Sequence, residues 1–105
     1  MQARGAFTIT ALSVPAARPR NIVGPQIRRI RYQLKISQAD LVVRCQRLGW
    51  DISRDILARI ELQIRWVGDY EMLFLAEALS VAPDRLLPSK SAFAEFRRKL
   101  GKAED

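Results

Sequence analysis

The feature that most constrains the fold of this chain is the helical spacing of its apolar residues from Asn21 onward. Between positions 24 and 88, apolar residues recur three or four positions apart in short segments, and residues that typically begin or end helices separate these segments. The sequence contains no pattern typical of a β-hairpin and no internal repeat. It therefore predicts an all-α domain built of five short helices.

The first two predicted helices have clear boundaries. Gly24 and Pro25 suit a helix start, because proline at the first helical position gives up no N–H that the helix needs. Ser37 is the expected N-cap of the second helix, and Asp40 three residues later completes a capping-box pattern. Gly49 is expected to end this helix.

The next three helices are bounded in the same way. Ser53 is the expected N-cap of the third helix, and Gly68 and Asp69 open the fourth. Pro83 starts a short fifth helix that Pro88 stops. The apolar residues expected on the five helices are Ile27, Ile30, Leu34, Leu41, Cys45, Leu48, Leu57, Ile60, Ile64, Met72, Leu75, Ala76, Leu79, Leu86 and Leu87.

Composition divides the chain into three parts. Residues 1–20 hold two prolines, small residues and three arginines, and are predicted to be a flexible arm. A feeble secretion signal, an expression remnant and an arm that follows a DNA groove are the alternatives. Residues 21–88 form the predicted helical domain. Residues 89–105 form a tail in which residues 91–100 are a candidate sixth helix, with Phe93, Phe96 and Leu100 on one face.

Charge is distributed unevenly along the chain. Lys and Arg total 18 against 11 for Asp and Glu, which gives a net charge of +7. Residues 1–60 hold eleven of the cations and three of the anions, whereas residues 61–105 are close to neutral. Such an asymmetry favours a polyanionic partner, nucleic acid first and an anionic membrane second. The alternative is a solvated basic surface that has no partner.

Composition also argues against several classes of function. The chain has no histidine and one cysteine, Cys45, so it lacks the commonest general base and a transition-metal ligand set. We therefore expect neither an enzyme, nor a metal, nor a cofactor. No apolar run approaches the roughly 18 residues of a membrane helix. A lone cysteine fits a reducing cytoplasm, where the protein is expected to associate with the nucleoid.

Several linked motifs identify a family resemblance. The segments that carry it are residues 27–31 (IRRIR), 36–41 (ISQADL), 52–54 (ISR), 58–61 (ARIE), 69–71 (DYE), 75–79 (LAEAL) and 86–87 (LL). In this order they resemble the Cro/C1-type (XRE family) helix-turn-helix, over roughly residues 22–88. The resemblance implies a five-helix, lambda-repressor-like domain.

The chain departs from the family pattern in four places. The stretch from Leu41 to Ser53 is about five residues longer than in compact phage repressors, as in a subgroup whose second helix ends in Leu-Gly-Trp. Gln63 replaces a helix-terminating glycine, so an altered exit from the third helix is expected. Gly68 replaces a threonine cap, and Asp55 puts a negative charge where the family faces DNA.

The resemblance assigns base reading to the third helix, which in this family enters the major groove. Carried over residue by residue, it implies that Arg54, Asp55 and Arg59 read bases. Arg donates two hydrogen bonds to guanine, and Asp accepts one from cytosine, so a G/C-containing half-site is expected. Ile56 either covers a thymine methyl or packs in the core, and packing is the favoured interpretation.

The resemblance also places phosphate contacts around the reading helix. Gln38 starts the second helix, where unsatisfied backbone N–H groups bind phosphate oxygen. Ser53 either caps the third helix or contacts phosphate as well. Arg65 is expected to contact the DNA backbone. Trp66 has three possible roles: contact with the DNA backbone, packing on its own domain, or packing at a dimer contact.

Arg31 and Glu61 are assigned a structural role. In this family the corresponding pair forms a partly buried salt bridge between the first and third helices. The pair is expected to fix how the reading helix is presented, and its net stabilisation is expected to be small.

The leading hypothesis from the sequence is a sequence-specific transcriptional regulator that binds double-stranded DNA. Repression is favoured over activation. One reading helix covers only a few base pairs, so a homodimer on a two-fold site is expected. The apolar residues offered for the dimer contact are Leu73, Phe74, Phe93 and Phe96. Alternatively, the C-terminal helix folds back on its own domain.

Two other functions stay open at this point. The chain is an antitoxin if residues 89–105 bind a toxin partner while the domain represses its own operon. It is a helical adaptor if the domain has kept the fold and lost DNA reading. Co-purification of a second protein distinguishes the antitoxin, and weak binding without base preference distinguishes the adaptor.

Overall fold

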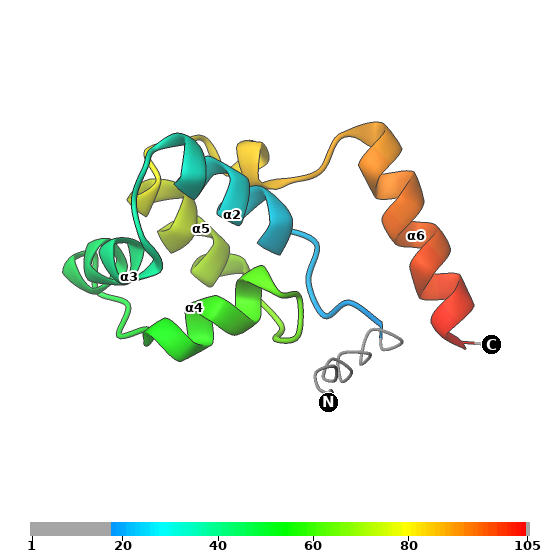
Figure 1. Cartoon of the computed structure of the whole chain (residues 1–105), viewed down its shortest axis with the longest axis horizontal. Coiled ribbons are helices and arrows are strands. Elements are labelled where there is room, and N and C mark those ends of the chain that lie inside the picture. Colours follow the sequence, from blue (N-terminus) through cyan, green and yellow to red (C-terminus); the bar gives the residue numbers. More distant parts are fainter. Residues whose placement is uncertain (1–17, 105) are drawn as a thin grey trace, which may run out of the picture.

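The computed structural model describes residues 18–104, all of whose regular secondary structure is helical (Figure 1). Most of the predicted N-terminal arm lies outside the described residues. The elements are α2 (Gly24–Gln33), α3 (Gln38–Arg47), α4 (Arg54–Glu61), α5 (Asp69–Ala78), the 3₁₀ helix η2 (Pro83–Leu86) and α6 (Lys90–Glu104). The predicted all-α fold class is confirmed. The fifth helix is a 3₁₀ turn, and the C-terminal helix is longer than predicted.

The helix starts follow the predicted caps. The Ser37 hydroxyl accepts from the backbone N–H of Asp40 at 3.0 Å, and the Asp40 carboxylate accepts from the N–H of Ser37 at 2.9 Å, a complete capping box. The Ser53 hydroxyl accepts from the N–H of Ile56 at 3.1 Å. At α5, the N–H of Gly68 donates to the carboxylate of Glu71 at 3.0 Å.

Four helices end in the same backbone motif. After each of α2, α3, α4 and α5, one residue adopts a positive φ: Lys35 at 59°, Gly49 at 110°, Gln63 at 64° and Ser80 at 59°. In each case two backbone N–H groups bond back to carbonyls of the last turn, which is the Schellman pattern. The expectation that Gln63 alters the exit from α4 was wrong, because Gln63 adopts the left-handed conformation that glycine usually supplies.

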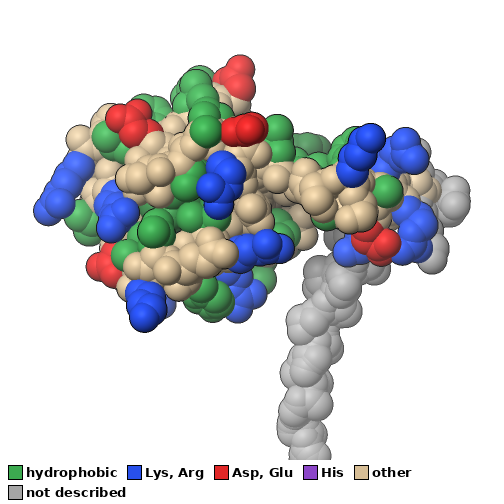
Figure 2. Space-filling model, turned by 90° about the horizontal axis from the view of Figure 1, so that it is seen from above, with side chains coloured by type: hydrophobic (Ala, Val, Ile, Leu, Met, Phe, Trp, Pro, Cys, Tyr) green, Lys and Arg blue, Asp and Glu red, His purple; other side chains and the backbone are tan. Residues whose placement is uncertain are grey.

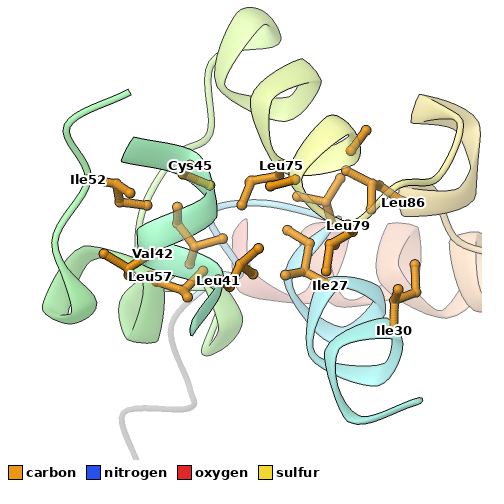
Figure 3. Close-up of a cluster of buried hydrophobic side chains, with 14 residues drawn as sticks. Ile27, Ile30, Leu41, Val42, Cys45, Ile52, Leu57, Leu75, Leu79 and Leu86 are labelled. Atoms are coloured by element: carbon orange, nitrogen blue, oxygen red, sulfur yellow. The ribbon is translucent and has the colours of Figure 1, made fainter. Parts of the chain in front are cut away.

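The core lies where α2, α3, α4, α5 and η2 meet (Figure 3). Figure 3 shows Leu41, Val42 and Cys45 of α3 facing Leu57 of α4 and Leu75 of α5. The predicted residues that are buried are Ile27, Ile30, Leu41, Cys45, Leu57, Ile60, Leu75, Ala76, Leu79 and Leu86. Burial also raises the pKa of the Cys45 thiol to about 11, so it stays protonated at neutral pH.

Three residues predicted to lie on the inward stripes are exposed, Leu34, Leu48 and Ile64, and so is Leu87 of the predicted fifth helix. Leu34, Leu48 and Leu87 are the C-caps of α2, α3 and η2, and Ile64 lies beyond the end of α4. A position at the end of a helix is buried only where another element covers it, as at Leu79, the C-cap of α5, which is buried. The core also contains buried residues that the helical spacing did not predict, namely Val23, Val42, Ile52 and Ala78.

The last helix lies apart from this bundle. In Figure 1, α6 is on the opposite side of the molecule from α3, and residues 87–89 connect it to η2. Across residues 18–104, no helix has the length and apolar character that crossing a membrane would require.

Candidate nucleic-acid interface

A buried ion pair fixes α4 against α2. Arg31 Nε donates to Glu61 Oε2 at 2.8 Å, and Arg31 Nη2 donates to Glu61 Oε1 at 2.9 Å. Each residue is only 6% exposed. Arg31 Nη1 also donates to the carbonyl oxygen of Ile36 at 3.0 Å, so the guanidinium bonds both helix α4 and the turn before α3. The predicted Arg31–Glu61 salt bridge is confirmed, and the Glu61 hydrogen bonds raise the pKa of Arg31.

The start of α3 joins this pair. The Gln38 side-chain amide donates to Glu61 Oε1 at 3.0 Å, so this side chain supports the ion pair. The backbone N–H groups of Gln38 and Ala39 belong to the first turn, where an α-helix has no carbonyl acceptor for them. A phosphate contact at this helix start is therefore available to the backbone, whereas the Gln38 amide already has a partner. The predicted phosphate role of Gln38 stays a prediction.

The first turns of α4 carry the predicted base-reading residues on the surface. Arg54, Asp55 and Arg59 are all exposed. Arg59 Nε lies 3.2 Å from Asp55 Oδ2, and both side chains remain more than half accessible. The unexpected negative charge of Asp55 thus has a cationic neighbour one turn away, and the pair holds Arg59 along the helix. Ile56 is half-buried against the core, in line with its interpretation as a packing residue.

A hollow of about 440 Å³ lies where α2, α3 and α4 converge. Its lining residues are Arg28, Arg31, Tyr32, Ser37, Gln38, Arg54, Ala58, Glu61 and Leu62. It brings together the start of α3 and the first residue of α4, which are distant in sequence. It also adds a basic side chain of α2 to the predicted set.

Arg28 and Tyr32 are the site residues that sequence reasoning missed. Arg28 Nη2 donates to the Tyr32 hydroxyl at 3.1 Å, and the guanidinium lies 5.3 Å from the centre of the Tyr32 ring. The Arg28 hydrogen bond lowers the pKa of this exposed hydroxyl. Their spacing of four residues on a helix was the available signal. It does not reveal that this face of α2 lies beside α3 and α4.

Arg65 lies in the connection from α4 to α5. Its Nη1 and Nη2 atoms donate to the two carboxylate oxygens of Glu71, at 2.9 and 3.3 Å. This bonding lowers the pKa of Glu71 and raises that of Arg65. The neighbouring Trp66 is exposed, with the Arg20 guanidinium 5.9 Å from the centre of its ring. Arg65 does not line the hollow, and its predicted phosphate contact stays a prediction.

Gln38 and Arg54 thus line one hollow. Ser53 caps α4 beside it, and Asp55 and Arg59 lie on the adjoining turns of this helix. Among residues 18–104, no cluster of three or more His, Cys, Asp or Glu residues has the arrangement of a metal site. Comparisons of the chain with protein-family models, curated proteins and solved structures found no match.

Proposed function

We propose that this chain is a sequence-specific, double-stranded-DNA-binding transcriptional regulator that inserts the first turns of α4 into the major groove. The observation that carries the proposal is the convergence of exposed Arg28, Arg54 and the first turn of α3 on one hollow, beside an exposed Arg59. The buried Arg31–Glu61 pair holds the two helices that present this surface.

The chemistry of α4 suits reading a base edge. An α-helix fits the major groove, and an Arg side chain donates a bidentate pair to guanine O6 and N7. Arg54 is the first residue of the helix and Arg59 lies five residues later, about 1.4 turns along it, so they address separate base pairs. When α4 lies in the groove, the Asp55 carboxylate accepts a hydrogen bond from cytosine N4, and its ion pair with Arg59 is then broken.

The chemistry of α2 and α3 suits the phosphate backbone. Free N–H groups and the partial positive charge at the start of α3 attract a phosphate oxygen. Arg28 supplies a full charge at the same hollow, and Tyr32 supplies a hydroxyl. These groups position the protein, and the side chains of α4 supply base preference.

The regulator acts as a homodimer in the cytoplasm, bound to the nucleoid, and as a repressor by occupying its site. One reading helix covers only a few base pairs, which limits the affinity of a single copy. Two copies on a two-fold site double the number of bases read and of phosphates bound.

Selection of bound duplexes from a random pool tests the proposal. We expect recovery of a G/C-containing, two-fold sequence, with affinity for it falling steeply as salt rises because Arg displaces counterions from phosphate. Arg54→Ala should lower affinity for the selected duplex by about 1–3 kcal/mol. Arg85→Ala, on the exposed side of η2, is the control and should change little. A pool that stays unenriched contradicts the proposal.

A further inference from the structure

The outer face of α5 is apolar and acidic. Tyr70 and Leu73 are 68% and 54% exposed, and they share this face with the exposed carboxylates of Asp69 and Glu77. The helix contains three acidic residues and no basic residue. The third, Glu71, lies toward the bundle and is bound by Arg65. On this face Leu73 lies between a carboxylate one turn before it and another one turn after it, with Tyr70 beside them, and Asp69 also borders the cleft between α5 and α6 of the same copy.

Helix α6 has the opposite charge and a matching stripe. It contains five basic and two acidic residues, and Figure 2 shows blue side chains gathered over it. Phe93, Phe96 and Leu100 recur at i, i+3 and i+7, which places them on one side of the helix. Arg97 and Lys99 flank this stripe and are exposed. The stripe is thus bordered by positive charge.

The apolar stripe of α6 is only partly covered by its own domain. Phe96 and Leu100 face a cleft of about 720 Å³, whose other apolar walls include Trp66, Met72 and Leu87. Phe93 is 47% exposed. Within residues 18–104, no other helix packs extensively against α6. A helix of this length is marginal in water unless its apolar face is packed, so α6 gains stability from a partner surface.

We propose that this partner surface is the outer face of α5 in a second copy of the chain. In a two-fold dimer, α6 of each copy packs its Phe93 stripe on Tyr70 and Leu73 of the other. Asp69 and Glu77 then lie near Arg97 and Lys99 across the contact. By sequence, α5 carries a charge of −3 and α6 a charge of +3. Direct pairing of two α6 helices brings together like charges and is disfavoured.

This exchange supplies the two-fold partner on which the proposed DNA binding rests, but the contact itself involves no DNA. It uses α5 and α6, and leaves the hollow between α2, α3 and α4 open. A test on the free protein therefore separates the two proposals. DNA binding can fail while the dimer forms, and the dimer can fail while a single copy still binds DNA weakly.

Sedimentation equilibrium of the full-length chain without DNA is the first test. We expect a dimer, and expect Leu73→Ser and Phe93→Ser each to raise its dissociation constant about tenfold or more, because each removes an apolar side chain from the contact. Val43→Ser, an exposed apolar position on α3, is the matched control and should leave association unchanged. Circular dichroism checks that all variants stay helical. A wild-type monomer, or dissociation insensitive to Leu73→Ser, overturns the proposal.

A charge-exchange experiment identifies which surfaces meet. Glu77→Lys alone and Arg97→Glu with Lys99→Glu alone should each weaken the homodimer severalfold. An equimolar mixture of these two variants should associate more tightly than either alone, since one contact of the mixed dimer is the wild-type pairing of α6 with α5 and the other places the introduced lysine of α5 beside the introduced glutamates of α6. Pairing of α6 with α6 predicts that Glu77→Lys has no effect and that the α6 variant associates more tightly than wild type. That result overturns the proposal.

Discussion

At the scale of the residue, Glu61 takes part in three side-chain hydrogen bonds in the candidate interface, as many as Arg31. Its carboxylate accepts two hydrogen bonds from Arg31 and one from Gln38, in a site where both members of the ion pair are buried. Removing either charge leaves the other buried without its partner, which costs far more than the intact pair contributes to stability.

We therefore expect Arg31→Ala and Glu61→Ala each to lower the free energy of unfolding by about 3–5 kcal/mol. The double variant Arg31→Met with Glu61→Leu should lose less than either single variant, because no charge is left stranded. Urea unfolding followed by circular dichroism measures all three. If the single variants unfold like wild type, the pair does not carry this penalty.

A second prediction at this scale concerns the Glu71 carboxylate and the pH dependence of stability. Hydrogen bonds from Arg65 and from the N–H of Gly68 lower its pKa, so the ionised form favours the folded state. Its contribution is fully present above the ordinary glutamate pKa of about 4.3 and is lost as pH falls through the lowered value. The stability difference between wild type and Glu71→Gln should therefore shrink from about pH 6 to about pH 3. Asp51→Asn, at an exposed carboxylate, is the control, and an unchanged difference contradicts this role of Glu71.

At the scale of the element, the helix ends are decided by backbone bonds more than by residue type. Lys35, Gln63 and Ser80 adopt a left-handed conformation that disfavours side chains with a Cβ. Each nevertheless allows two N–H groups to bond back to the preceding turn. Gln63 has an additional bond, because its side-chain amide donates to the carbonyl oxygen of Asn21 at 2.9 Å.

Glycine substitutions separate these contributions. Lys35→Gly should raise the free energy of unfolding by about 1 kcal/mol, because glycine adopts positive φ without steric cost. Gln63→Gly gains the same relief but loses the bond to Asn21, so its net effect should be close to zero. Chemical denaturation of the two variants side by side tests this. Equal stabilisation by both would show that the Gln63 bond contributes nothing.

At the scale of the whole molecule, the sequence predicted what depends on neighbours along the chain. The caps at Ser37 and Ser53 and the buried Leu57 and Ile60 follow from spacing alone. The exposure of Leu34 and Leu48 did not follow from spacing, because a helical stripe in the sequence does not show which helix ends are covered by another element. The hollow that joins Arg28 to Arg54 depends on how α2 packs on α4. No local pattern specifies that packing.

The central claim is that the side chains of α4 read bases while the start of α3 positions the protein. Affinities of wild type, Arg54→Ala, Arg59→Ala and Gln38→Ala across a library of single-base variants of the selected duplex test it most directly. The two Arg variants should relax preference at particular base pairs, each costing about 1–3 kcal/mol on the best sequence. Gln38→Ala should weaken strong and weak sequences about equally, since it acts through positioning. Uniform loss of affinity across the library in both Arg variants would contradict base reading by α4.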